Sequence, residues 1–470
     1  MRLLDSFIDE LDRTILEDCY RGVGSAACDP IAMLKLAVYA CLQGHGSPAK
    51  WAIMAEDSVS TRWLIRGLRP SRACCYRFRD RLGPVIEELV QQFVQGAIDE
   101  GLVDPQSGVL DGTAIRAAAS RHRLVNRQTL QRRLQILDAA VHNDEQGTPT
   151  ENAPKWLART PHGRMEQQQR HQQAATVLAQ REQENSARSK SKQLSEKNLQ
   201  VSVSEPEVIL GRDKEKVFGP IYTPQFIVEP SSLLVLSFDV FSQATDAGTL
   251  PVMAEKTQQV LGHPLKTIIA DGLYCSLLDL RYCDQNEIEL IAGGSEDATA
   301  SPSRGDNSHQ PVKLDKSLFQ WSPEEQMFLC PEGHKMEPCH RERVPRRDGE
   351  SLMATCYRCS PLHCTSCLRR SNCVDNPQKG RVIKRLDGQE LVDAHQEKMK
   401  SERAKDLYKL RGQIIERAFA DVKQHRGGRR LHGYGPARAR VDVGLLVLAQ
   451  NFLTIIRLRK ARENNVVART

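Results

Sequence analysis

A chain of 470 residues is long enough for about three domains, which excludes a single small domain. Hydrophobic residues make up 40% of it and charged residues 27%, as in a globular protein. Because aromatic residues make up only 5%, we expect part of the chain to lie outside the hydrophobic core. Residues 401–470 hold 16 Lys and Arg against 6 Asp and Glu, a local net charge of +10. The whole chain carries only +7. Basic residues gathered at one end favour a nucleic-acid partner over an acidic membrane surface.

The sequence has no signal for a membrane or for export. Its N-terminus lacks a basic region followed by an apolar stretch, and no window approaches the ~20 apolar residues of a spanning helix. We therefore expect a cytoplasmic protein with no membrane partner. The 14 cysteines then favour reduced thiols or metal ligands over disulfides, and half of them lie between Cys330 and Cys373.

Residues 1–102 have the pattern of an all-α domain. Asp29 caps an apolar helix that Gly44 ends, and residues 85–98 keep an apolar face at helical spacing. Between them, Ser71 caps a short helix that carries several arginines. Two interpretations of this helix stay open: it reads DNA, or its arginines are a solvated face.

Strand patterns begin at residues 109–111, a short apolar run that ends in Asp111. Residues 121–203 are rich in Arg, Gln, Lys, Glu and Ser, so we expect a solvated helix or a partly disordered insertion there, with little core. Strands return at 216–241, and a helical stretch leads to a further apolar run that ends at Asp271. This order indicates an α/β sheet with functional groups at the carboxyl ends of its strands.

The last part of the chain separates into two kinds of sequence. The cysteine-rich stretch looks loop-like, whereas residues from 401 onward are helical and end in a strongly apolar helix around Leu445 to Ile456. The domains we expect are a helical N-terminal domain at residues 1–102, the first part of an α/β core at 103–295, a cysteine-rich insertion at 296–400 and the last part of the core at 401–470.

Three carboxylates stand out by their placement. Asp111 and Asp271 each end a buried-looking strand and precede a glycine, and Glu416 lies in an amphipathic helix among basic residues. Hard oxygen ligands of this kind suit magnesium, and two such ions can promote phosphodiester chemistry. The structural alternatives are a turn or helix cap for each aspartate and an exposed ion pair for the glutamate.

The sequence around these carboxylates resembles that of a known family. Val109-Leu-Asp-Gly-Thr113 looks like the first-aspartate strand of insertion-sequence transposases with a DDE triad, and Ile268-Ile-Ala-Asp-Gly-Leu-Tyr274 resembles their second motif. The stretch from Tyr408 to Lys423 is similar to their third motif, in which Tyr, Arg, Glu and Lys recur in that order. Four residues separate Arg411 from Glu416, where three are usual.

The resemblance implies an RNase H-like mixed sheet with flanking helices and a DNA transposase. Asp111, Asp271 and Glu416 would hold magnesium or manganese ions, cut the transposon ends and join the freed 3′-hydroxyl to target DNA. The partner would be double-stranded DNA, bound by a homodimer associated with the nucleoid. Asp239 and Asp421 are the substitutes if one carboxylate is misassigned. The expected phosphate contacts are Arg411, Arg417, Lys423, Arg426, Arg429 and Arg430.

The cysteine-rich stretch predicts a second metal site. Its two Cys-x-x-Cys pairs begin at Cys356 and Cys364, a spacing that suits half of a tetrahedral zinc site. Only four residues separate the pairs, which is short for one relaxed site. Iron–sulfur ligation is the alternative to zinc. The preferred ligands are Cys330, Cys364, Cys367 and Cys373, with Cys359 in reserve, and the histidines of this stretch are His334, His340 and His363.

Two other classes of function stay open from the sequence. A zinc-containing DNA-binding protein whose catalytic centre is inactive or repurposed would keep the same motifs. A metal-dependent nuclease that cuts without strand transfer would use the same site, because hydrolysis and transfer differ only in the nucleophile.

Overall fold

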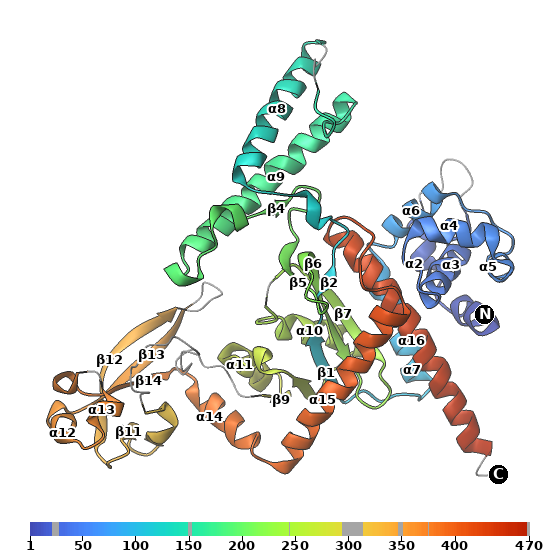
Figure 1. The fold of residues 1–470 in the computed structure, drawn as a ribbon. Helices are drawn as coiled ribbons and strands as arrows, with labels where there is room; N and C mark the ends of the chain where they lie inside the picture. Colours follow the sequence, from blue (N-terminus) through green and yellow to red (C-terminus); the bar gives the residue numbers. More distant parts are fainter. Residues whose placement is uncertain are drawn as a thin grey trace. The chain divides into compact units, whose positions relative to one another are not determined.

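The computed structural model describes residues 1–20, 28–148, 153–243, 245–293, 314–345, 351–374 and 376–467. The expected boundary between residues 295 and 296 lies outside these ranges. The chain forms two compact units, drawn in Figure 1. Unit 1 comprises Met1–Asp246, Val252–Leu265 and Arg411–Thr470, and unit 2 comprises Ala247–Pro251 and Lys266–Leu410.

The N-terminal part of unit 1 is helical, as predicted. The Asp29 side chain accepts a hydrogen bond from the Ile31 amide and Ser71 accepts one from the Cys74 amide, so both predicted caps are present. Gly44 follows its helix with a φ of +77°, a conformation that favours glycine. The helices are α1 (Arg2–Asp9), α2 (Thr14–Glu17), α3 (Pro30–Leu42), α4 (Pro48–Asp57), α5 (Val59–Leu64), α6 (Arg72–Arg81) and α7 (Ile86–Asp99).

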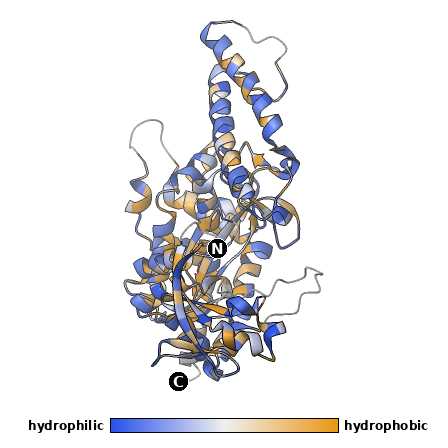
Figure 2. Cartoon of the chain, turned by 90° about the vertical axis from the view of Figure 1, so that its left-hand side faces the viewer, coloured by the Kyte–Doolittle hydropathy of each residue, from blue (hydrophilic) through white to orange (hydrophobic). Residues whose placement is uncertain are grey.

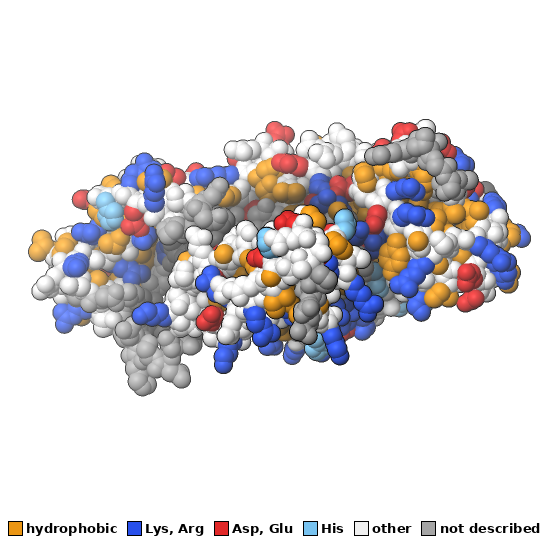
Figure 3. Space-filling model, turned by 90° about the horizontal axis from the view of Figure 1, so that it is seen from above, with side chains coloured by type: hydrophobic (Ala, Val, Ile, Leu, Met, Phe, Trp, Pro, Cys, Tyr) orange, Lys and Arg blue, Asp and Glu red, His pale blue; other side chains and the backbone are white. Residues whose placement is uncertain are grey.

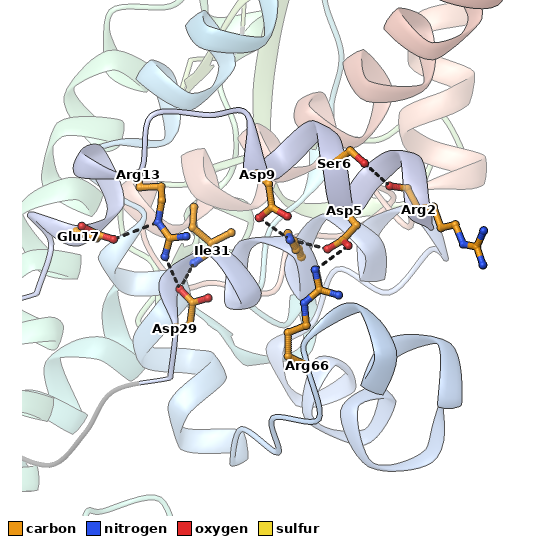
Figure 4. Close-up of polar contacts among 10 residues, drawn as sticks. Arg2, Asp5, Ser6, Asp9, Arg13, Glu17, Asp29, Ile31 and Arg66 are labelled. Carbon is orange, nitrogen blue, oxygen red and sulfur yellow. Dashed lines mark hydrogen bonds and ion pairs between the residues drawn. The ribbon is translucent and has the colours of Figure 1, made fainter.

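A partly buried ion cluster joins α1, α3 and the turn that follows α5. The Lys35 ammonium of α3 lies 2.5 Å from Asp5 and 2.7 Å from Asp9, both on α1, and Arg66 pairs with the second oxygen of Asp5 at 2.9 Å. Figure 4 shows Asp5, Asp9 and Arg66 converging. Burial opposes ionisation of Asp5, but hydrogen bonds from Lys35 and Arg66 outweigh it and lower its pKa. The pairing satisfies a lysine that would otherwise be buried uncompensated.

The strands of unit 1 are antiparallel and centred on β6 (Phe218–Val228). This strand pairs with β1, β2, β5 and β7, and its residues are buried along almost the whole length. Burial on both faces explains why the sequence here is mostly apolar and does not alternate with polar residues. The partner strands are β1 (Ser107–Gly112), β2 (Ile115–Arg116), β5 (Ile209–Arg212) and β7 (Val235–Phe241).

Helix α16 (Pro436–Val467) is the predicted apolar helix near the C-terminus. By length and composition, Pro436–Asn464 could cross a membrane, but 78% of its apolar window is buried inside the protein. It packs against α3, α7 and β7, so its apolar residues form part of the core of unit 1.

The insertion between β2 and β5 is a helical hairpin of α8 (Arg127–Glu145) and α9 (Pro161–Ser186), with β3 (Leu124–Val125) and β4 (Val201–Ser202) paired at its base. The solvated-helix alternative is therefore confirmed. Two small clusters, around Leu130 and Leu137, are buried between the segments. The outer faces are largely hydrophilic in Figure 2, and Figure 3 shows Lys and Arg side chains on them. The short helices nearby are η1 (Arg121–Arg123), η2 (Lys190–Lys192) and η3 (Glu196–Asn198).

Unit 2 begins with a parallel strand pair connected by a helix. Strand β8 (Thr267–Ala270) pairs in parallel with β9 (Glu289–Ala292), and η4 (Gly272–Tyr274) and α11 (Leu277–Gln285) make the crossover. Helix α10 (Leu250–Leu261) precedes β8, and α14 (Gln389–Lys398) and α15 (Glu402–Ala420) lead back to unit 1. Parallel and antiparallel strands flanked by helices confirm the predicted α/β class.

The cysteine-rich stretch forms a five-stranded antiparallel sheet, so the expectation of a loop-like segment is wrong. Its strands are short or carry Pro, Arg and Glu, which hide the alternation that marks a strand. Phe328, Met336 and Tyr357 supply the buried residues of a small core. The elements are η5 (Lys316–Leu318), β10 (Gln320–Ser322), β11 (Met327–Leu329), β12 (Lys335–Pro345), β13 (Ser351–Cys359), α12 (Pro361–Ser366), α13 (Arg370–Cys373), η6 (Pro377–Lys379) and β14 (Val382–Leu386).

Candidate active site

Asp111 lies at the end of β1 and is paired with a cation from α15. Its Oδ1 accepts a hydrogen bond from the Gly112 amide at 2.8 Å, and its Oδ2 lies 2.9 Å from Arg411 Nη1. The side chains of Asp111 and Arg411 are 16% and 21% exposed. The guanidinium fixes the orientation of the carboxylate and connects the first and third sequence motifs.

Glu416 is carried on the exposed side of the same helix. The apolar residues of this stretch of α15 are buried, and Phe419 packs against Phe226 with ring centroids 5.5 Å apart. Phe226 is the register partner of Asp111, so this packing holds the turn next to Glu416 against the β1–β6 pair. Glu416 itself is exposed and forms no hydrogen bond or ion pair with any other described residue. Its carboxylate is therefore accessible to a ligand.

Lys423 approaches the same strand end from a π-helical turn, η7 (Asp421–His425). Its ammonium donates hydrogen bonds to Thr113 Oγ1 at 2.6 Å and to the Ala114 carbonyl at 2.8 Å. Burial, followed by repulsion from the nearby Lys214 ammonium, lowers the pKa of Lys423 to about 8. A cation is thus held two residues beyond Asp111.

Lys214 is a site residue that sequence reasoning missed. It lies in the turn between β5 and β6, is exposed, and its ammonium is 5.5 Å from the Phe419 ring centroid. The neighbouring Asp213 and Glu215 pair with Arg116, which holds this turn beside the core. A charged turn between strands is common on protein surfaces, so nothing in the sequence singles Lys214 out.

The other basic residues of the third motif have different surroundings. Arg426 is 9% exposed and binds both Asp421 oxygens at 3.0 Å and the Leu42 carbonyl at 2.9 Å. It therefore fastens the π-helical turn to the end of α3. Arg430 donates to the carbonyls of Ala117 and Ala118.

Arg417 and Arg429 are exposed, on α15 and after the π-helical turn. Arg429 forms a partly exposed pair with Glu215 at 2.8 Å. Such a surface pair is weak and can be exchanged for a phosphate. Contact of these basic residues with DNA stays a prediction.

The two substitute aspartates are engaged elsewhere. Asp239 is 6% exposed and pairs with Lys256 and Arg440, each at 3.0 Å, and Asp421 pairs with Arg426. Both carboxylates have structural partners, so neither displaces Glu416 as a candidate.

Asp246 is a further carboxylate near the end of β1. Its Oδ1 accepts a hydrogen bond from Gln225 Nε2 at 2.5 Å, and Gln225 is the register partner of Gly112. A Cβ on Gly112 would lie only 2.7 Å from Asp246 Oδ1, so the glycine permits this close approach. The Ser- and Thr-rich loop around Asp246 gave no signal of a site.

Asp271 lies in unit 2, directly after β8. Its Oδ1 accepts a hydrogen bond from the Leu273 amide at 2.8 Å, which caps η4, and Tyr274 is fully buried in the same turn. Asp271 thus occupies a carboxyl strand end and also acts as a cap. Asp111 and Glu416 belong to unit 1, and the gathering of all three carboxylates stays a prediction.

The predicted zinc ligands surround a cavity of about 30 Å³ in unit 2. Cys359 and Cys364 are buried, and burial, followed by the proximity of Cys364 and Cys330, raises the pKa of the Cys359 thiol. Cys359, placed in reserve from the sequence, is therefore central to the cluster. His334 and His363 stack at a centroid distance of 4.0 Å. The cavity is lined by Cys330, Cys359, Cys364, Cys367 and Cys373 together with both histidines.

The fold and these side chains define a class of α/β enzyme that carries acidic residues at strand ends and on a later helix. Residues 329–456 match the family of the transposase DDE domain, and residues 1–81 match a transposase domain family (DUF772). Both matches are to transposase families, and together they support a DDE transposase of an insertion sequence. No curated protein matches it.

The DDE-domain match, with the mixed sheet of the structure, supports the RNase H-like core that the sequence motifs implied. The protein is an enzyme of the transposase kind, it acts in DNA transposition, and DNA is its partner. The DDE-domain match includes Glu416 and the cysteine cavity, whereas Asp111 and Asp271 lie outside both matched segments.

Proposed function

We propose that the protein cuts DNA at the ends of its own transposon and joins the freed 3′ ends to target DNA, using Asp111, Asp271 and Glu416. The observation that carries this proposal is the ion pair of Asp111 with Arg411 at 2.9 Å. It connects the strand of the first motif to the helix of the third motif across 300 residues of sequence. A chance pair of surface charges would not be expected to join two motifs of one catalytic family.

The carboxylates fit divalent metal ions by their chemistry. Asp111 offers hard oxygens at a strand end, and Glu416 offers an exposed carboxylate with no described partner. Together with Asp271 they would hold magnesium or manganese. Such ions, when bound, favour attack by an oxygen nucleophile on a phosphodiester and stabilise the leaving oxygen.

Cations from three parts of unit 1 would bind and orient the phosphate. Arg411 holds the Asp111 carboxylate, Lys423 lies at Thr113, and Lys214 extends from the β5–β6 turn. Fixed positive charge beside the scissile phosphate lowers the cost of the charge that develops during displacement. Exposed Arg417 and Arg429 would contact the DNA backbone farther from the reacting atoms.

We also propose that the cysteine cavity holds a structural zinc ion. Cys330, Cys359, Cys364 and Cys373 are the set best supported by burial, because Cys359 and Cys364 belong to the apolar core of the sheet and the other two pack against it. Four thiolates satisfy zinc in tetrahedral geometry. Cys367 accepts a hydrogen bond from the Arg369 amide at 3.4 Å and is the alternative fourth ligand.

Two further features of the proposal follow from transposition itself. Pairing two transposon ends requires at least two active sites, so we expect a homodimer on DNA. Because DNA is the substrate, the protein would act at the nucleoid in the cytoplasm.

The test is cleavage of a labelled duplex that carries the transposon's own ends, with and without Mg²⁺. Glu416→Ala should abolish cleavage and retain DNA binding, because the residue would hold metal rather than DNA. Glu402→Ala is the matched control, an exposed glutamate at the start of the same helix, and should cleave as the wild type does. Wild-type cleavage by Glu416→Ala would overturn the assignment. DNA binding without cleavage by any variant, wild type included, would favour an inactive or repurposed DNA-binding protein.

A further inference from the structure

The β12–β13 hairpin carries a second group of metal-ligating side chains, on the face opposite the cysteine cavity. Tyr357 and Cys359 face the apolar core of the sheet, so Cys356 faces the other way. His340 is the cross-strand partner of Cys356, and Glu342 follows two residues later on the same side. One ligand atom from each of His340, Glu342 and Cys356 lies within 4.8 Å of the other two.

A β-bulge produces this arrangement. The register of β12 against β13 shifts between Pro338 and His340, so that His340 rather than Cys339 is opposite Cys356. The Cys339 thiol still lies 3.3 Å from His340 Nδ1. The bulge thus brings successive side chains of β12 to one side of the sheet, where strict alternation would separate them.

We propose that His340, Glu342 and Cys356 bind a zinc ion. Nitrogen, carboxylate oxygen and thiolate sulfur are the three donor types that zinc takes in proteins, with bonds of roughly 2.0–2.3 Å. His340 Nε2 lies 3.4 Å from Glu342 Oε2, a separation that suits neighbouring ligands of one such ion. Three protein ligands leave a fourth position for water.

The surrounding contacts orient two of these ligands. Glu342 uses its other oxygen, Oε1, to pair with Lys384 of β14, the register partner of Cys356. His340 directs its other nitrogen, Nδ1, to the Cys339 thiol. Because Oε1 and Nδ1 have these partners, Oε2 of Glu342 and Nε2 of His340 remain for the ion. In metal sites, the second polar atom of a ligand commonly binds a neighbouring protein group in this way.

The site is separate from the cysteine cavity. Cys356 is fully buried whereas His340 is exposed, so the ion would lie at the surface of the sheet. There it would cross-link the bulged strand β12 to β13. Cys359 serves the cavity on the other face of the same strand. Loss of the ion at His340 should therefore leave the ion of the cysteine cavity in place.

The test is the zinc content of the full chain after gel filtration and a chelator wash. His340→Ala should lose one equivalent relative to the wild type, and Cys364→Ser should lose the equivalent of the cysteine cavity. The double variant should lose both. Because His340 is exposed, its substitution tests the site even if Cys356→Ser fails to fold.

His142→Ala is the matched control, an exposed histidine beside Glu145 in unit 1, and should keep all bound zinc. Cobalt substitution gives a second readout, because the sulfur-to-cobalt absorption of the wild type should decrease in His340→Ala without disappearing. Unchanged zinc in His340→Ala would overturn the proposal. Removal of the second equivalent by the wash in every protein would also overturn it, as an adventitious ion only.

Discussion

At the residue scale, Lys423 combines burial with charge in a way that predicts a pH dependence. Because its pKa is lowered to about 8, the ammonium is present below that pH and is lost as the pH rises through it. If the ammonium binds the scissile phosphate, cleavage should decline over this range. Lys423→Arg keeps its charge throughout, so its pH profile should lack the decline.

The Lys214 ammonium provides a control for the electrostatic origin of this effect. Its charge contributes to the lowered pKa of Lys423. Lys214→Gln should therefore shift the decline in cleavage to higher pH. An unchanged midpoint in this variant would show that a different group controls the profile.

A second prediction concerns the side chain of Arg411. Because it orients Asp111, Arg411→Gln should lower the cleavage rate by about 10–100-fold, the usual effect of removing a contact that positions a metal ligand. DNA affinity should change much less. Lys409→Gln is the matched control, since Lys409 is exposed on the same helix and pairs only with Asp406 among the described residues. An equal decrease in both variants would indicate a general loss of charge.

At the scale of elements, local signals in the sequence were sufficient for the helices and not for the cysteine-rich sheet. Ser71 caps the helix that it precedes, and Gly44 ends the helix that it follows. Helix caps and ends could therefore be predicted from the sequence without any tertiary contact. In β12, by contrast, Pro338 and the bulge beside it interrupt the alternation of side chains. The pairing of β12 with β13 depends on a long-range register that residue patterns do not specify.

The zinc ion proposed for the cysteine cavity leads to a prediction about this sheet. Its core is small, and structural zinc contributes about 10–16 kcal/mol of apparent binding free energy in small zinc domains. Replacing Cys359 and Cys364 with Ser should release the zinc of the cavity and expose the sheet to proteolysis. Cys283→Ser, a buried thiol of α11 outside the cluster, should do neither. Full protease resistance of the double variant would contradict a stabilising metal.

At the scale of the whole molecule, the sequence motifs identified the α/β class and the family but only part of the candidate site. The sequence predicted Asp111 and Glu416 as candidates because a strand-end aspartate and a helical glutamate fit a known pattern. Lys214 and Asp246 were not predicted, since only tertiary packing brings the turn of Lys214 to Phe419 and the loop of Asp246 to Gly112. The sequence grouped the cysteines that line the cavity, but the central position of Cys359 among them required the structure.

We propose that Asp111, Asp271 and Glu416 hold the same metal ions. Iron-mediated backbone cleavage tests it directly: Fe²⁺ with ascorbate replaces Mg²⁺, and hydroxyl radicals cut the chain close to the bound ion. We predict cuts near all three residues in the wild type, competed by Mg²⁺ and absent from Asp111→Asn. Cuts at the cysteine-rich sheet alone, or cuts that persist unchanged in Asp111→Asn, would contradict the claim.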